Sequence, residues 1–291
     1  CNGITELGLP NNLQTIGDYA FRNTQLNTVI VPNSVTSIGL GAFQGCPLES
    51  ITLPFVGKNR TVNNSVASTS SWNDSGSQYL FGYIFGGATS YGAYSSTPSI
   101  PSGTIYQGQS YYRSGSNYSG NDYYWTGYYI PSTLKTVTIT DATGISANAF
   151  YGCTMIESLT LNEGITTIYG KTLYNCTTLK SMVLPSSVTE LGSYAFYGCA
   201  NMSSVTLSNL ITIDYNTFQN CTSLDGVALP ETLTSIGSYA FSGCTSLTGI
   251  NLPNSVTSID SYAFDGCNGI TELGLPNNLQ TIGDYAFRNT Q

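Results

Sequence analysis

The chain has no histidine and few charged residues. Histidine is the commonest general base, metal ligand and pH-sensitive group of proteins, so its absence excludes Ser-His-Asp and Cys-His catalytic sites within the chain. Charged residues make up 8% of the 291 residues, against about 25% in an ordinary soluble domain. No apolar run approaches the roughly 18 residues of a transmembrane helix, so we expect no membrane insertion of this segment.

The few charges that are present are mainly acidic. The chain holds 16 Asp+Glu and 8 Lys+Arg, which gives a net charge of -8. Such a chain neutralises few phosphates, so we expect no nucleic-acid partner. The carboxylates are scattered, without a D-x-D-x-D calcium loop or a recognisable glycosidase pair, which predicts no metal, no cofactor and no enzymatic activity. The chain opens at Cys1 without a signal peptide, which indicates a piece of a longer protein.

A repeat of 22 or 23 residues fills most of the sequence. Its unit reads L-x-x-(I/V)-x-L-P-x-x-(V/L)-x-x-I-G-x-Y-A-F-x-G-C, and one copy runs from Leu247 to Cys267. This period and leucine spacing predict a mainly β leucine-rich-repeat solenoid with parallel strands and short helical turns. In each coil, Leu-Pro ends a short strand, Ile-Gly marks a second extended segment, and a tight or helical turn carries Ala and Phe inward. The strand-like segments begin at Ile4, Leu26, Leu48, Leu134, Ile156, Leu179, Met202, Leu224, Leu247 and Ile270.

The Leu-Pro, Ile-Gly and Tyr-Ala-Phe-x-Gly-Cys elements resemble the BspA-like family of leucine-rich repeats. The resemblance covers residues 1–54 and 134–291. It implies a secreted or surface-displayed protein of bacteria or some protozoa, since the family's proteins are usually of that kind and several are associated with adhesion. It brings no catalytic residues with it.

Residues 267–291 repeat residues 1–25 letter for letter, at an offset of 266. The ordinary coils differ from one another at many positions, so this identity indicates a second, longer period. One interpretation is a parent protein built of tandem 266-residue modules, and the other is an artificial duplication of one segment. We favour the first, because neither end of the chain shows the polar capping coil of an isolated solenoid. Nine coils at about 4.8 Å each give a module an axial rise of about 43 Å.

An insertion at 55–133 separates coils 1–54 from coils 134–291 and is expected to replace one convex arm. Ten tyrosines fall within 89–129, among many Ser and Gly. The composition permits a flexible loop or an ordered lobe, and it is typical of binding loops. We expect Phe81, Tyr83, Ile84 and Phe85 to form the core of the lobe. The candidate contact surface consists of Tyr111, Tyr112, Tyr118, Tyr123, Tyr124, Trp125, Tyr128 and Tyr129.

Six cysteines occupy one slot of successive coils and should form a ladder of structural thiols. Stacked side chains about 4.8 Å apart exceed the ~3.8 Å between the Cβ atoms of a disulfide, so we expect free, buried thiols. Zinc is not expected, because the sequence has neither a C-x-x-C pair nor histidine. The ladder consists of Cys153, Cys176, Cys199, Cys221, Cys244 and Cys267.

These observations predict a structural extracellular repeat protein that forms a long surface stalk or filament. Its expected partner is itself, through axial or lateral self-assembly. The alternative is a discrete cell-surface adhesin that binds a host matrix protein or glycan through the Tyr-rich insertion or the concave sheet. The sequence leaves open whether modules are joined within one chain or by head-to-tail stacking of separate chains.

Overall fold

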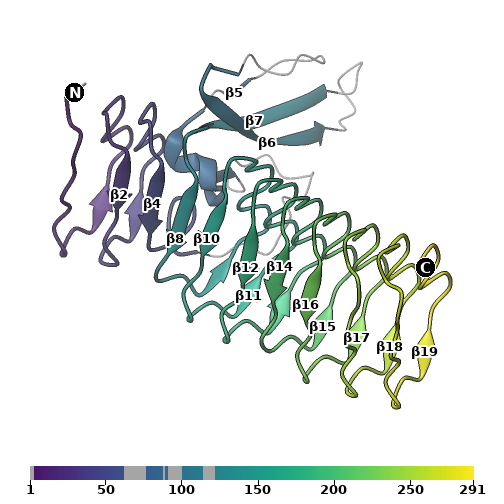
Figure 1. Ribbon diagram of the computed structural model, residues 1–291. Helices are drawn as coiled ribbons and strands as arrows, with labels where there is room; N and C mark the ends of the chain where they lie inside the picture. Colours follow the sequence, from purple (N-terminus) through teal and green to yellow (C-terminus); the bar gives the residue numbers. More distant parts are fainter. Residues whose placement is uncertain (1–2, 62–76, 88, 91–99, 114–121) are drawn as a thin grey trace.

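The structure of the protein, a computed structural model, describes residues 3–61, 77–87, 89–90, 100–113 and 122–291. The chain winds into coils stacked along one axis, with the two termini at opposite ends (Figure 1). The leucine-rich-repeat solenoid predicted from the repeat is confirmed.

The longer strands lie side by side along one face of the solenoid and pair in parallel, in the orders β10-β8-β4-β2 and β12-β14-β16. Within them a buried residue alternates with outward-facing ones, as in β2 and β14. The strands are β2 (Thr28–Ile30), β4 (Ser50–Leu53), β8 (Thr136–Ile139), β10 (Ser158–Thr160), β12 (Ser181–Val183), β14 (Ser204–Thr206) and β16 (Gly226–Ala228). The expected strands beginning at Ile4, Leu247 and Ile270 do not form. A glycine lies in each of those segments (Gly8, Gly249 or Gly274), but Gly226 of β16, the equivalent of Gly249, shows that a glycine alone does not prevent the strand.

A second row of two-residue strands forms at the Ile-Gly segments, as the repeat predicts. Their pairing is also parallel, and each strand buries the Ile or Leu of its coil in the interior, except at the C-terminal end. The row consists of β1 (Thr15–Ile16), β3 (Ser37–Ile38), β9 (Gly144–Ile145), β11 (Thr167–Ile168), β13 (Glu190–Leu191), β15 (Thr212–Ile213), β17 (Ser235–Ile236), β18 (Ser258–Ile259) and β19 (Thr281–Ile282).

The turns that carry Ala and Phe are not the short helical turns expected from the repeat. Each is an open turn in which alternate backbone N–H groups donate to the next coil, while those between them donate to a carbonyl three residues back in the same turn. Tyr19, Phe21 and Asn23, for example, donate to the carbonyls of residues 40, 42 and 44 at 3.0, 2.8 and 2.7 Å. The bonds to the next coil interrupt the run of bonds within the turn that a helix would need, and among the described residues only η1 (Ser77–Tyr79) and η2 (Phe81–Phe85) are helical.

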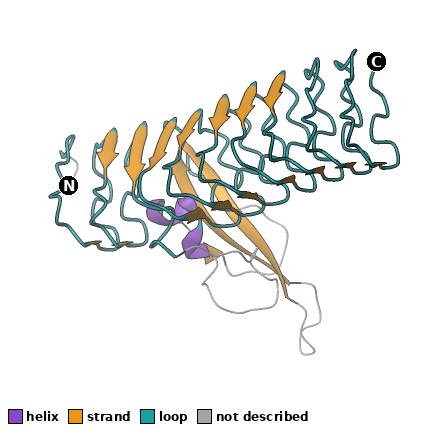
Figure 2. Cartoon of the chain, turned by 90° about the horizontal axis from the view of Figure 1, so that it is seen from below, coloured by secondary structure: helices purple, strands orange, loops and turns teal. Residues whose placement is uncertain are grey.

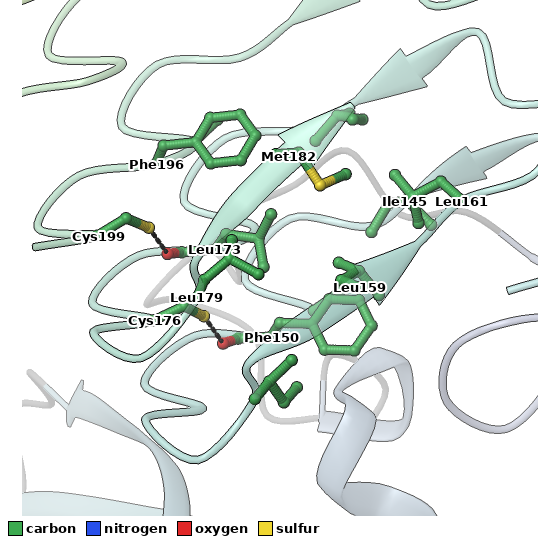
Figure 3. Close-up of a cluster of buried hydrophobic side chains, with 14 of the residues drawn as sticks. Ile145, Phe150, Leu159, Leu161, Leu173, Cys176, Leu179, Met182, Phe196 and Cys199 are labelled. Carbon is green, nitrogen blue, oxygen red and sulfur yellow. Dashed lines mark hydrogen bonds between the residues drawn. The ribbon is translucent and has the colours of Figure 1, made fainter. Parts of the chain in front are cut away.

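The core is a continuous column of apolar side chains inside the coils (Figure 3). One phenylalanine of each typical coil stacks on its equivalent in the next. The ring of Phe241 is fully buried and lies 5.2 Å from that of Phe218 and 5.3 Å from that of Phe264. A coil therefore shares much of its buried surface with its neighbours, as solenoid stability requires.

The insertion does not interrupt the stack. Strand β4 pairs directly with β8. Helix η2 lies where the turn of a coil would lie, because Phe43 donates its N–H to Ile84 (2.9 Å) and Phe81 donates to Ala149 (2.8 Å). Strands β6 (Thr104–Arg113) and β7 (Asp122–Pro131) form an antiparallel hairpin, with β5 (Thr89–Ser90) on the other side of β7. The hairpin projects beyond the outline of the coils in both views (Figures 1 and 2).

Candidate interaction surfaces

The cysteine slot is a buried ladder of free thiols. The six predicted cysteines, together with Cys46 of the second coil, are buried and unpaired. From Cys176 onward each thiol donates a hydrogen bond to a backbone carbonyl of the preceding coil, such as Cys176 to Phe150 (3.1 Å) and Cys199 to Leu173 (3.2 Å; Figure 3). Burial raises the pKa of these thiols, to about 12 for Cys199 and Cys267. A protonated, enclosed thiol is a poor nucleophile and a poor metal ligand, so the ladder serves the coil stack and not a chemical site.

The predicted contact tyrosines lie on the hairpin, as far as the structure describes them. In the β6–β7 register Tyr111 pairs with Tyr124 and Tyr112 with Tyr123, next to Trp125. The structure describes the backbone of these five residues and not their side chains. Tyr118 lies outside the described residues. The hairpin therefore brings five of the eight candidates together at the level of the backbone.

Tyr128 does not belong to a contact surface, which corrects the expectation from composition. Its side chain is 5% exposed, and its ring meets that of Tyr83 edge-on at 6.1 Å. The register explains this burial: Tyr128 is opposite Gln107, which is also buried, and residues directly opposite in a hairpin share a face. Tyr129 is half-buried, with its ring 5.8 Å from that of Tyr106.

The base of the hairpin is fixed to the solenoid by close packing and one buried amide. Gln107 accepts a hydrogen bond from the N–H of Gly82 (2.6 Å) and donates to the carbonyl of Ala149 (2.9 Å), so it connects the hairpin, η2 and the next coil. A Cβ atom at Gly82 would lie 2.4 Å from that of Tyr128, and one at Gly127 would lie 1.8 Å from the ring of Tyr106. The base is thus a close fit that requires glycine at both positions.

Helix η2 contributes to the solenoid core and not to a separate core of the lobe. Phe81, Ile84 and Phe85 are fully buried within the column of the coils, and the ring of Phe81 lies 5.0 Å from that of Phe150. Tyr83 is half-buried against this cluster. The expectation of a lobe core made of these four residues is therefore wrong, because η2 fills the Phe position of the coil that the insertion interrupts.

Sequence reasoning missed a line of tyrosines along the turns, which we call the tyrosine ribbon. Neighbouring rings stack, as in Tyr174 on Tyr197 (4.6 Å) and Tyr239 on Tyr262 (4.7 Å), or meet edge-on beside Tyr215 (5.3 and 5.9 Å). Stacked faces cover one another, so the stacked parts of the ribbon present ring edges and hydroxyl groups to the outside. Two positions of the repeat supply all of these rings except Tyr215: the tyrosine of the Tyr-Ala-Phe element and, in Tyr151, Tyr174 and Tyr197, the residue that follows the Phe position. The ribbon consists of Tyr151, Tyr174, Tyr194, Tyr197, Tyr215, Tyr239, Tyr262 and Tyr285.

Several of these tyrosines have a left-handed backbone. At Tyr194, Tyr239, Tyr262 and Tyr285 φ lies between 57° and 62°, a conformation that costs a residue with a side chain about 1–2 kcal/mol. Tyr262 shows what offsets this cost: its ring stacks on both sides and its N–H donates to Asp284 in the next coil at 3.0 Å. The open turn therefore depends on coil-to-coil contacts, and a lone coil could not hold it.

The two identical segments, residues 1–25 and 267–291, form the two end coils and expose opposite faces. Ile16 pairs with Ile38 of the following coil and is 5% exposed. Its equivalent Ile282 pairs with Ile259 of the preceding coil and is 49% exposed. The two copies of this segment therefore make different contacts: the first packs against the coil that follows it, and the second packs against the coil that precedes it.

The contact between the last two coils includes the clearest ion pair of the described residues. Arg288 donates from Nε and Nη2 to the two carboxylate oxygens of Asp265, at 2.9 and 2.6 Å. These bonds lower the pKa of Asp265, and the guanidinium also lies 5.1 Å from the ring centre of Tyr262. Arg22 is the equivalent of Arg288 in residues 1–25.

The described residues contain no group of three or more His, Cys, Asp or Glu side chains that could hold a metal ion. None of the helices within them has the length and apolar character needed to span a membrane. The candidate interaction surfaces described above are the hairpin, the tyrosine ribbon and the end coils.

Among solved structures, one with a TM-score above 0.5 supports the fold. A leucine-rich repeat protein from Eubacterium ventriosum is 18% identical, with a TM-score of 0.52, over 96% of this chain and 69% of its own. One from Bacteroides ovatus is 19% identical, with a TM-score of 0.45, over 97% of this chain and 69% of its own. A leucine rich cell surface protein from Faecalibacterium prausnitzii is 20% identical, with a TM-score of 0.34, over 99% of this chain and 85% of its own.

Comparison with curated proteins finds no match. The BspA type leucine rich repeat region, in contrast, matches residues 1–75, 127–226 and 201–291, in six copies. These ranges include most of the chain and every complete coil outside the insertion. The chain belongs to the BspA-type leucine-rich repeat family.

Proposed function

We propose that this chain is part of a structural protein of the cell surface, in which tandem 266-residue modules stack into one continuous solenoid and form a long stalk or filament. The observation that carries this proposal is the shared end coil. Residues 1–25 have the same sequence as residues 267–291, and the described residues 3–25 and 267–291 each form a coil of the stack.

The hydrogen bonds at the two ends are compatible with a single coil that has neighbours on both sides. In residues 1–25 the N–H groups of Tyr19 and Phe21 donate to the coil that follows. In residues 267–291 the carbonyls of Asp284 and Ala286 accept from Tyr262 and Phe264 of the preceding coil, at 3.0 and 2.7 Å. The donors and acceptors are different atoms, so one coil can make both sets at once.

The side-chain packing at the two ends is also compatible with a single coil that has neighbours on both sides. Ile16 and Phe21 contact the following coil, with the ring of Phe21 5.5 Å from that of Phe43. Phe287, the equivalent of Phe21, stacks on Phe264 of the preceding coil at 5.2 Å. A shared coil in mid-solenoid would therefore extend the phenylalanine stack in both directions. Rigidity over a long stalk would follow from the backbone bonds between coils at the turns and from the strand pairs in both rows, where these form.

A chain with a second copy of residues 26–291 after Gln291 tests the proposal in solution. Small-angle X-ray scattering should show a rod whose length grows by about 43 Å per added module, at about 4.8 Å for each coil. A scattering curve of two bodies joined by a flexible link would contradict a continuous solenoid.

The alternative function is adhesion to a host matrix protein or glycan. The projecting hairpin favours it, since the hairpin is fixed at its base and reaches beyond the coils (Figure 2). Saturable binding to immobilised matrix proteins or a glycan array, lost when Tyr111, Tyr112 and Trp125 are changed to Ser, would favour adhesion over a purely structural role. Lobes that only touch neighbouring modules would give no such binding.

A further inference from the structure

Most of the tyrosine ribbon lies within a stretch of the chain that has no basic residue of its own. Residues 181–287 contain eight Asp and Glu and no Lys or Arg, whereas residues 1–180 contain eight acidic and seven basic residues. The net charge of -8 is therefore concentrated in the coils that follow Lys180. A surface with charges of one sign over this extent attracts a partner of the opposite sign.

Two cations of the chain itself lie against the ribbon, one from before this stretch and one from after it. The Nζ atom of Lys171 lies 5.4 Å from the ring centre of Tyr194. The guanidinium of Arg288 lies 5.1 and 5.3 Å from the ring centres of Tyr262 and Tyr285. These distances are within the limit of about 6 Å for a cation–π interaction. The ribbon therefore offers contacts that suit a cationic side chain.

Tyr215, between these two places, is out of register with the rest of the ribbon. Tyr194 and Tyr239 are the second residue before the Phe of their coils, whereas Tyr215 is the third residue before Phe218. Its ring is turned, with interplanar angles of 81° to Tyr194 and 87° to Tyr239, so it stacks on neither. Tyr215 is 43% exposed, and none of the described Lys and Arg side chains lies over it. Its ring thus has a face that no other tyrosine of the ribbon covers.

Two hydrogen-bond acceptors adjoin Tyr215 in the chain. The carboxylate of Asp214 is exposed and accepts a bond from the hydroxyl of Ser193 at 3.3 Å. Asn216 is 4% exposed; its Nδ2 donates to Gln219, but its Oδ1 is a buried acceptor without a hydrogen-bond partner among the described residues. A buried acceptor of this kind calls for a donor. A guanidinium suits this set of groups, because it stacks on an aromatic face and donates through several N–H groups.

We propose that the turn at residues 214–216 binds an arginine side chain from a basic segment of a partner protein. The guanidinium lies on the open face of Tyr215 and pairs with Asp214. The chain contains one such arrangement already, since Arg288 lies beside a tyrosine of the ribbon and pairs with Asp265. The other carboxylates of the same coils attract the rest of the basic segment. This partner surface goes beyond the proposed stalk and does not depend on how modules are joined.

Fluorescence anisotropy of labelled hexa-arginine and hexa-lysine peptides, titrated with the full chain, tests the proposal. We expect saturable binding of hexa-arginine, several-fold tighter than that of hexa-lysine, because the lysine ammonium lacks the planar fork of donors that stacks and pairs at once. Equal affinity for the two peptides would overturn the proposal, because net charge alone would then explain the binding. The absence of hexa-arginine binding at low ionic strength would also overturn it.

Two matched pairs of substitutions locate the site. Tyr215→Leu should weaken hexa-arginine binding about two- to fivefold, whereas Tyr215→Phe keeps the ring face and should leave the affinity unchanged. Asp214→Asn should weaken the binding at least as much. Asp225→Asn is its control, because it removes the same charge from the same stretch, beside strand β16 and away from the turn, and should have a clearly smaller effect.

The proposal would be wrong if Tyr215→Leu bound hexa-arginine as tightly as the wild type, or if Asp214→Asn and Asp225→Asn gave equal losses. All four variants should keep the circular dichroism spectrum of the wild type, since the three side chains are exposed. If Tyr215→Leu changed the spectrum, the pair of Asp variants would decide the question. Neither result affects the tandem-module experiment, which measures the length of the rod and not the binding of a peptide.

Discussion

Replacement of Phe241 by alanine probes the phenylalanine stack where it is most complete. The side chain is fully buried, and its ring is parallel to its neighbours on both sides, with interplanar angles of 13° to Phe218 and 3° to Phe264. The ring cannot be replaced by a local shift, because the coils on either side are fixed by backbone bonds from Phe218 to Ala240 and from Phe241 to Ala263, both 2.8 Å. Phe241→Ala should therefore leave a cavity.

The expected loss is at the upper end of the range for such cavities. Truncation of a buried phenylalanine costs about 3–5 kcal/mol, and each lost aromatic pair contributes about 0.5–1.5 kcal/mol within that loss. Phe287 is the matched control, because it occupies the same slot in the end coil, is only partly buried, and stacks on Phe264 alone. We expect Phe287→Ala to cost about half as much, on the order of 2 kcal/mol.

Equilibrium unfolding in urea, followed by circular dichroism, would give both free energies. The reasoning would be refuted by a loss below about 1.5 kcal/mol for Phe241→Ala, or by equal losses for the two variants. Either result would mean that the coils collapse around the missing ring and that the stack does not determine stability.

Three further predictions follow from the buried polar groups and the hairpin. The free energy of unfolding should fall above about pH 9, by about 1.4 kcal/mol per pH unit for each enclosed thiol. The reason is that these thiols ionise in the unfolded chain, whereas burial keeps their pKa high in the folded chain. Urea titrations at several pH values would show no such fall if the thiols were accessible. Gln107→Leu should cost about 2–3 kcal/mol in the same assay, since it leaves the N–H of Gly82 and the carbonyl of Ala149 without this partner; an unchanged midpoint would count against the amide link. Changing Tyr111, Tyr112 and Trp125 together to Ser should leave the urea midpoint within the error of the wild type while altering association in sedimentation velocity, and unfolded coils would show that the hairpin belongs to the core.

The repeat allowed the coils, both strand rows and the buried thiols to be predicted, because each position faces the same surroundings in every coil. Leu-Pro and Ile-Gly recur at fixed spacing, so one copy of the repeat is enough to predict which side chains of a coil are buried. The open turn was harder to predict. Its left-handed tyrosines are stable only against a neighbouring coil, and no local pattern in Tyr-Ala-Phe distinguishes that turn from a helical one.

The insertion was the least predictable part, because its position depends on long-range contacts. Residues 81–85 do not carry the repeat pattern, yet η2 supplies the missing Phe of the interrupted coil. The burial of Tyr128 follows from its register against Gln107, which composition does not contain. Part of the ribbon is the recurring tyrosine of the repeat, but Tyr151, Tyr174 and Tyr197 occupy a position that the repeat unit leaves variable.

Electron microscopy of the native material tests the central claim most directly, by measuring the spacing between successive lobes along the axis. The account predicts long filaments or stalks with lobes about 43 Å apart, the rise of nine coils at about 4.8 Å. Compact single particles, or filaments whose lobe spacing does not match one 266-residue module, would contradict it.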